Sequence, residues 1–207
     1  MNFVRTHKYS ALVLSLICVV LLAVASSLSA QQINLKLDAQ RSEVHWVLKD
    51  TLQTVKGSFA MKQGHFSFYP EQDKEEWGRA EGVVVIDVSS GASGNKTRDA
   101  RMNHEFLESS KYPIAIFRAK RFSGVIRQGP LQTVKVDGTI TLHGVEHPLM
   151  LVFKVLLEGN KVAAETGFEI PYVDWGIKDP SIPMIRVEKK VLVEVAARGV
   201  IEFIPAK

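Results

Sequence analysis

Apolar and polar residues alternate along most of the chain after residue 40, which is the pattern of β-strands with one buried face. Residues 42–49, for example, place Val44, Trp46 and Leu48 on one face. Other runs of this kind cover residues 54–61, 65–70, 79–88, 114–122, 131–142, 148–159, 161–170 and 187–203. The pattern therefore predicts eight or nine strands.

The connections between these strands are short, as at residues 143–145 and 158–160. Short connections join antiparallel neighbours, because a parallel pair needs a crossover of roughly a dozen residues or more. Some runs, such as residues 83–86 and 148–157, are apolar at successive positions, which an open sheet with one wet face does not require. We therefore expect an all-β fold, a closed antiparallel barrel of about eight strands that is wide enough to hold one small ligand.

The N-terminal segment has a different pattern. Basic residues come first, residues 11–25 are almost wholly apolar, and small residues follow up to Ala30. This order predicts a secretory signal peptide over residues 1–30, with cleavage after Ala25, Ser27 or Ser29 as alternatives to Ala30. The apolar run is shorter than the roughly 20 residues that span a bilayer. An uncleaved anchor is the other interpretation of the segment.

Removal of this segment changes the charge and the cysteine content. The whole chain carries a net charge of +4, and two of its basic residues, Arg5 and Lys8, would be lost. Cys18, the single cysteine, would be lost as well, which leaves residues 31–207 as one domain without a thiol. We expect a periplasmic or secreted protein with no membrane span after cleavage. No cluster of basic residues indicates nucleic-acid binding.

Residues 95–113 do not follow the strand pattern and predict a short helix. Asn95 or Thr97 is a suitable cap for its start, and Asp99 lies near this end, where a carboxylate is favourable. Met102 and Phe106 are four residues apart and give the helix one apolar face. We expect this helix to lie across one opening of the barrel, either as a lid over a cavity or as a plug of the core.

Three separated motifs resemble those of the YceI-like family of bacterial secreted proteins. They are N-x-x-R-D-x-x-M at residues 95–102, L-E-x-x-K-Y-P-x-x-x-F at residues 107–117, and G-x-I-T-L-H-G-V-x-x-P at residues 138–148. Residues 37–49 also resemble the opening of that family. The resemblance implies a lipocalin-like barrel that binds an isoprenoid or another amphiphilic lipid, such as a quinone or a fatty-acid derivative. Residues 171–190 depart from the Gly-rich loop of the better-known relatives.

A protein of this kind needs few polar contacts, because burial of an apolar chain is itself favourable. The predicted ligand-binding residues are Trp46, Phe59, Phe66, Arg98, Asp99, Met102, Phe106, Phe117, Phe168 and Trp175. Three residues of this set have an alternative role. Arg98 and Asp99 either contact a headgroup or fix their own loop, and Trp175 either lines a site or packs in a turn capped by Asp174.

His143 and His147 raise the alternative of a small metal-dependent or hydrolytic enzyme. They flank a turn rather than lying on one helix face, and no HExxH motif surrounds them. We expect instead that His143 satisfies backbone groups at the turn and that His147 is solvated. No nucleophile motif, catalytic residue, metal site or cofactor is predicted.

A filled barrel that serves as an interaction module is a third interpretation of the sequence. The oligomeric state stays open, and a homodimer is one possibility.

Overall fold

The computed structural model describes residues 32–70 and 77–204. The predicted signal peptide, residues 1–30, lies outside the described residues. The strands are β1 (Gln32–Leu37), β2 (Glu43–Lys49), β3 (Thr54–Tyr69), β4 (Gly78–Ala92), β5 (Ile114–Ser123), β6 (Gln132–Leu142), β7 (Val145–Glu158), β8 (Lys161–Ile170) and β9 (Val191–Ile204). The helix α2 (Lys96–Arg101) and the π-helical turn η1 (Met102–Phe106) lie between β4 and β5. Within these ranges, no helix is both long and apolar enough to cross a bilayer.

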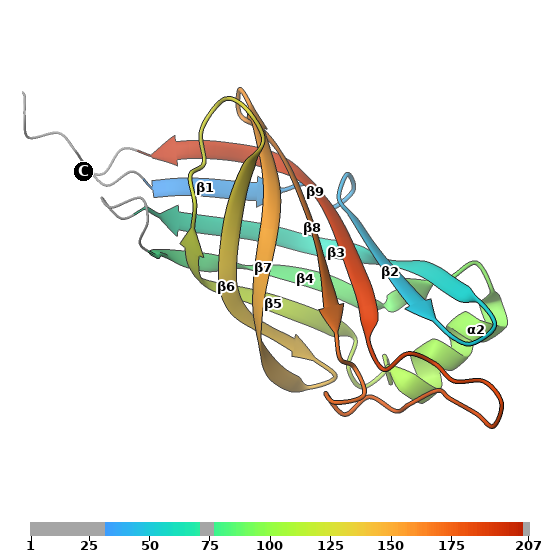
Figure 1. Cartoon of the computed structure of the whole chain (residues 1–207). Helices are drawn as coiled ribbons and strands as arrows, with labels where there is room; N and C mark the ends of the chain where they lie inside the picture. Colours follow the sequence, from blue (N-terminus) through green and yellow to red (C-terminus); the bar gives the residue numbers. More distant parts are fainter. Residues whose placement is uncertain (1–31, 71–76, 205–207) are drawn as a thin grey trace, which may run out of the picture.

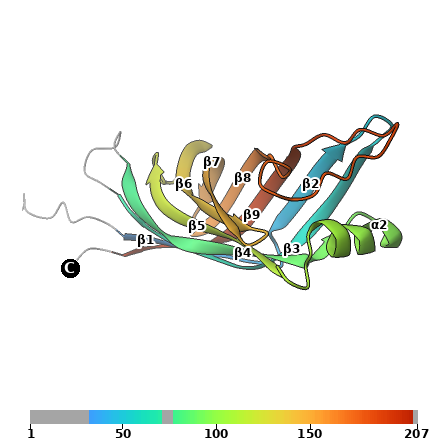
Figure 2. The same ribbon diagram turned by 90° about the horizontal axis from the view of Figure 1, so that it is seen from below.

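The strands form one antiparallel sheet that closes on itself (Figures 1 and 2). Neighbouring strands pair in chain order from β3 to β9, and both β3 and β9 pair with β1 and with β2. The backbone groups at the two ends of the sheet are therefore satisfied by closure. The predicted all-β, lipocalin-like barrel with a short helix at one opening is confirmed.

The strands β1 and β2 lie end to end between β3 and β9, and together they take the place of one strand of the barrel. β1 pairs with the later halves of β3 and β9, whereas β2 pairs with their earlier halves. Ser42 fixes the bend between them, since its hydroxyl donates to the carbonyl of Asp38 at 2.7 Å and accepts from the N–H of Arg198 at 3.0 Å. The strands of the described part of the chain therefore fill eight positions, as the sequence predicts.

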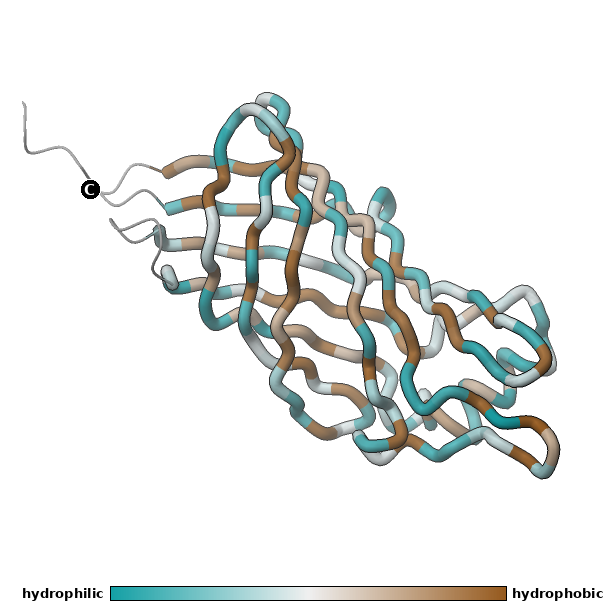
Figure 3. The backbone as a smooth tube through the Cα atoms, viewed as in Figure 1, coloured by the Kyte–Doolittle hydropathy of each residue, from teal (hydrophilic) through white to brown (hydrophobic). Residues whose placement is uncertain are grey.

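Alternation along each strand separates the inner and outer faces, and Figure 3 shows apolar and polar residues alternating along the tube. Val136 of β6 is opposite Leu151 of β7, and both are buried inside the barrel. Met150 and Val152, on either side of Leu151, are exposed on the outer face. The apolar run of β7 therefore has only one buried face, and its outer apolar residues face solvent.

Residues 95–113, which we call the lid, lie across one end of the barrel (Figure 2). Asn95 caps α2, because its side chain accepts the N–H of Arg98 at 3.0 Å. The Arg98 guanidinium donates to the hydroxyl of Ser93 at 2.7 Å, and the Asp99 carboxylate accepts the N–H of Ser93 at 2.8 Å. Neither α2 nor η1 contains a fully buried residue, although Phe106 and Leu107 pack against the cluster of Ile170, Tyr172 and Ile177. The lid is therefore held by polar contacts at its ends and by partly buried apolar contacts.

The far end of the lid is fixed to the β6–β7 turn by Glu108, Tyr112, His143 and Gly144, which we call the latch. The Glu108 carboxylate lies 2.7 Å from Nε2 of His143, and the rings of His143 and Tyr112 are 4.3 Å apart. Gly144 has a φ of +79°, and a Cβ there would lie 2.6 Å from the Tyr112 ring. The interpretation that His143 satisfies backbone groups is therefore wrong, since its ring nitrogen pairs with a carboxylate of the lid.

The latch predicts that His143→Asn lowers the free energy of unfolding by about 1 kcal/mol, the usual contribution of one hydrogen bond. Asparagine accepts the positive φ of 51° at this position, so the substitution removes the Glu108 contact without straining the turn. Urea denaturation measures the effect. His45→Asn is the matched control, because it removes the solvent-exposed His45–Glu43 pair and should change little. Equal losses in the two variants would contradict the latch.

Candidate functional site

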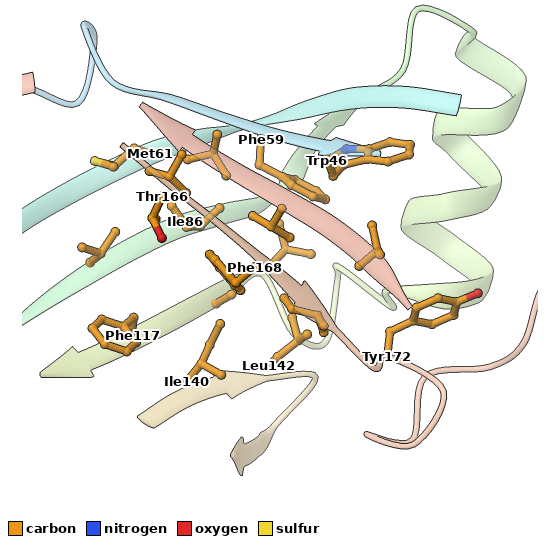
Figure 4. Close-up of a pocket in the computed structure, with 18 of the residues that line it drawn as sticks. Trp46, Phe59, Met61, Ile86, Phe117, Ile140, Leu142, Thr166, Phe168 and Tyr172 are labelled. Atoms are coloured by element: carbon orange, nitrogen blue, oxygen red, sulfur yellow. The ribbon is translucent and has the colours of Figure 1, made fainter. Parts of the chain in front are cut away.

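The barrel encloses a cavity of about 670 Å³, within the range of ligand pockets. Every position around the barrel contributes side chains to its wall, and the lid covers one end (Figure 4). At the other end, the ring of Phe68 packs edge-on against Phe122 at 5.0 Å and lies 5.7 Å from the ring of Phe66. The cavity is therefore a long chamber with its opening beside the lid.

The wall of this chamber is almost entirely apolar. Inward-facing residues of β3 to β9 alternate with outward-facing ones, so each strand contributes every second side chain. Val44 is opposite Phe59 in the β2–β3 register, and Phe117 is opposite Ile140 in the β5–β6 register; all four line the cavity. Such a surface binds by excluding water from an apolar molecule rather than by forming hydrogen bonds.

Most of the predicted ligand-binding residues lie in this wall. The strand residues among them point into the chamber, and the lid residues face it from one end. Those that line the cavity are Trp46, Phe59, Phe66, Arg98, Met102, Phe106, Phe117 and Phe168. The Arg98 side chain reaches the opening while two of its nitrogens bond to Ser93, so it both fixes the loop and borders the cavity.

Asp99 and Trp175 do not line the cavity. The Asp99 carboxylate is turned toward the backbone and hydroxyl of Ser93, which it holds at the start of the lid. Trp175 lies in the turn after β8 and stacks on His147, with ring centroids 4.1 Å apart and an angle of 2° between the rings. Asp99 therefore fixes its own loop, and Trp175 packs in a turn. In both cases the structure agrees with the alternative to ligand contact.

The sequence analysis overlooked the aliphatic part of the wall and the residues around the opening. The aliphatic residues could have been found from the strand alternation, which the prediction applied mainly to aromatic side chains. They include Val84, Ile86, Val134, Val136, Leu149, Leu151, Val155, Val162, Val193, Val195 and Ile201. The opening is bordered by Lys49, Asp50, Gln53, Asn95, Thr97, Arg101, Lys178, Ile182 and Ile185. Asn95, Thr97 and Arg101 belong to the predicted helical segment, whereas the only sequence signal for Lys178, Ile182 and Ile185 is the unusual length of the connection over residues 171–190.

Polar groups inside the chamber are few. The hydroxyl of Thr166 faces the cavity (Figure 4), and among the described residues it has no hydrogen-bond partner, although the side chain is only 9% exposed. Tyr172 donates its hydroxyl to the carbonyl of Glu188 at 2.8 Å, and burial, aided by the negative charge of Asp179, raises the pKa of Tyr172 to about 12. Tyr172 therefore stays protonated at neutral pH.

His143 and His147 do not converge on one site. His143 lies in the latch, and His147 is opposite Ile140, which places it on the inner face of the barrel beneath Trp175. Nε2 of His147 is buried and has no partner among the described residues, so the expectation that His147 is solvated is wrong. Within residues 32–70 and 77–204, no three His, Cys, Asp or Glu side chains form a group that could hold a metal ion.

Solved structures share this architecture. A polyisoprenoid binding domain from Saccharophagus degradans, implicated in plant cell wall breakdown, has a TM-score of 0.62 and 19% sequence identity, covering 83% of this chain and 98% of that one. Burkholderia cenocepacia BcnA has a TM-score of 0.60 and 19% identity, over 78% of this chain and 98% of that one. A Campylobacter jejuni YCEI protein has a TM-score of 0.54 and 19% identity, over 72% of this chain and 86% of that one. These similarities establish a common fold.

Sequence comparison identifies the family of this chain. A UPF0312 protein of Vibrio parahaemolyticus is 30% identical over 107 residues, which are 51% of this chain and 52% of that protein. A UPF0312 protein of Vibrio campbellii matches to the same extent. The aligned part thus spans about half the length of these curated relatives. The profile of the YceI-like domain matches residues 35–198, which include most of the barrel, the lid and the latch, and the chain therefore belongs to the YceI-like domain family.

Proposed function

We propose that this chain is a non-enzymatic binding protein that holds a long apolar or amphiphilic lipid inside its barrel. A polyisoprenoid, a quinone with an isoprenoid tail or a fatty-acid derivative is the class of cargo that fits. The observation that carries this proposal is the chamber of about 670 Å³, apolar along its length and open at one end beside the lid. The binding domain from Saccharophagus degradans, named for polyisoprenoids, supports the same class.

The energetics of the chamber favour a chain over a compact polar ligand. Each methylene group moved from water into an apolar site contributes roughly 0.8 kcal/mol, so an extended hydrocarbon tail gains affinity along its whole length. Aromatic side chains such as Phe59, Phe117 and Phe168 provide broad contact surfaces for such a tail. The polar end of the cargo would then remain at the opening, where Arg98 and Lys178 meet solvent.

Thr166 adds one polar contact point inside the wall. Its hydroxyl is buried without a partner among the described residues, and such a group is costly unless something bonds to it. A cargo with a carbonyl or hydroxyl group at this depth would satisfy it, whereas a pure hydrocarbon would leave it unpaired. Thr166 thus favours a functionalised chain.

The same proposal places the protein in the periplasm or outside the cell. Residues 1–30 have the order of basic, apolar and small residues that directs export, and Cys18 is the single cysteine of the chain. After cleavage the protein would contain no thiol to be oxidised in that compartment. There it would act as a carrier or sensor of its lipid.

Filling the chamber should prevent binding. Ala164 of β8 is buried and lines the cavity, so Ala164→Phe places a ring in the space of the cargo. We expect the affinity for a fluorescent polyene fatty acid, measured by titration, to fall at least about tenfold, or 1.4 kcal/mol.

Ala163→Phe is the matched control, because the neighbouring side chain of the same strand lies outside the cavity lining. It should bind the probe like the wild-type protein. Unchanged binding by Ala164→Phe, with circular dichroism showing an intact barrel, would refute the proposal that the chamber is the binding site.

The lid should control retention of the cargo more than stability of the barrel. Phe106 lines the cavity and is half-buried, so Phe106→Asp places a carboxylate against an apolar chamber, which costs several kcal/mol if it stays buried. Because neither α2 nor η1 contains a fully buried residue, the lid should swing outward at lower cost than a strand would move. We expect faster release of the fluorescent probe in stopped-flow displacement, with most of the melting temperature kept.

Val136→Asp is the comparison for this variant, since Val136 is buried in a barrel strand and also lines the cavity. This substitution should unfold the protein or lower its melting temperature strongly. If Phe106→Asp were as destabilising as Val136→Asp, residues 95–113 would be a plug of the core rather than a lid.

A further inference from the structure

Two loops project beyond the opening of the barrel and are joined to each other. One is the β2–β3 connection, residues 50–53, and the other is the β8–β9 connection, residues 171–190 (Figures 1 and 2). The N–H of Thr51 donates to the carbonyl of Arg186 at 3.0 Å, and the N–H of Glu188 donates to the carbonyl of Lys49 at 2.9 Å. The two loops therefore form one hydrogen-bonded unit at this end of the molecule.

The end of this unit exposes large apolar side chains. Leu52 is 74% exposed, Ile182 is 52% exposed and Met184 is 94% exposed. We call these three residues the apolar tip. Isolated apolar residues on a surface are ordinary, but these three lie on loops that are hydrogen-bonded to each other. Together they form a projecting apolar surface, which is typical of an interaction site.

Met184 is held in this position by a tight turn. Ile182 and Ile185 exchange two backbone hydrogen bonds of 3.0 and 3.1 Å across Pro183 and Met184. Met184 has a φ of +76°, in the position of a type II turn that glycine usually occupies. The chain thus keeps a large apolar side chain where both the backbone and the exposure disfavour it, and such strain often marks a functional position.

The apolar tip is continuous with the opening of the chamber. Ile182, its neighbour Ile185 and Val187 line the cavity from the longer loop, and Gln53 lines it from the shorter one. An apolar surface therefore runs from the wall of the chamber, past the lid, to the exposed side chain of Met184. A partner that contacts the tip would also cover the entrance of the cavity.

Charged groups around the tip complement an anionic surface. Among the described residues, Lys49, Lys178 and Arg186 form no ion pair within 4.0 Å, although Lys178 helps to lower the pKa of Glu105 and Arg186 that of Asp179. The carboxylate of Asp50 accepts N–H groups of its own turn at 2.7 and 2.9 Å, and that of Asp179 accepts the N–H of Ser181 at 2.8 Å. Both carboxylates keep their charge, but the two loops and the adjoining Lys49 together carry five basic residues, Lys49, Lys178, Arg186, Lys189 and Lys190, against four acidic ones, Asp50, Asp174, Asp179 and Glu188. Exposed apolar side chains with basic residues beside them are a common composition of a membrane-surface contact.

We propose that the apolar tip docks on the surface of a lipid bilayer and thereby places the opening of the chamber against the membrane. Leu52, Ile182 and Met184 enter the boundary between headgroups and acyl chains, and the basic residues contact phosphate groups. Docking itself is independent of the cargo, but its use in loading and unloading rests on the function proposed above. An apolar lipid would then pass between bilayer and chamber without crossing water.

Vesicle flotation tests this docking. The purified protein is mixed with vesicles of phosphatidylcholine containing phosphatidylglycerol, and the bound fraction is measured against the variant Leu52→Asn/Met184→Asn. Asparagine tolerates a positive φ, so position 184 should lose its apolar contact without backbone strain. We expect the wild-type protein to bind and the double variant to bind at least about tenfold more weakly, a difference of 1.4 kcal/mol.

Met150→Asn/Val152→Asn is the matched control, because these residues are 55% and 43% exposed on the outer wall, away from the tip. It should bind vesicles like the wild-type protein. Melting temperatures show that each variant is folded, and Met184→Gly alone provides a second test with no strain at that position. Binding of the fatty-acid probe should be the same in all variants, because none of the substituted residues lines the chamber.

Three results would overturn the docking proposal: no binding of the wild-type protein to vesicles, equal binding by the double variant, or a dimer that depends on the tip and binds no vesicles. Failure of the function proposed above has a different signature. In that case the fatty-acid probe does not bind any variant, while the tip still determines binding to vesicles.

Discussion

Closure of the sheet is the constraint on which the rest of this structure depends. β3 and β9, of 16 and 14 residues, are long enough for each to pair with both β1 and β2. Two short strands thereby close a gap that one straight strand would have to span. Gly199 permits the close approach of β9 to the carbonyl of Lys36 at this seam, where a Cβ would collide. The closed wall separates an apolar interior from water, and only its ends remain to be covered.

The two ends are covered by different means. Aromatic packing around Phe68 and Phe122 fills one end, whereas the other carries the lid, which is attached by a cap at Asn95 and by the latch at Glu108. The motifs on which the family resemblance was based lie mainly in these attachments. Residues 95–102 begin the lid, and residues 107–117 and 138–148 meet at the Glu108–His143 pair. These motifs therefore maintain the closure of the chamber, while the wall that contacts cargo needs only apolar side chains of suitable size.

The strand pattern predicted the barrel and much of the wall because the period of two is imposed by the backbone itself. Phe66 and Phe117 were placed inside for that reason, and the helical period gave Met102 and Phe106. Residues 171–190 have no such period, so neither the stacking of Trp175 on His147 nor the exposed turn at Met184 followed from the sequence. His143 was also misinterpreted, because its partner Glu108 is 35 residues away and only the fold brings them together.

The central claim is that the chamber holds a lipid, and mass spectrometry of an organic extract tests it most directly. The protein is purified from its own host without detergent, extracted with organic solvent, and compared with an Ala164→Phe variant prepared in parallel. The account predicts a long-chain amphiphile in near-stoichiometric amount from the wild-type protein and a marked depletion of the same compound from the variant. Extracts that contain no such lipid, or the same lipid in equal amount from both proteins, would contradict it.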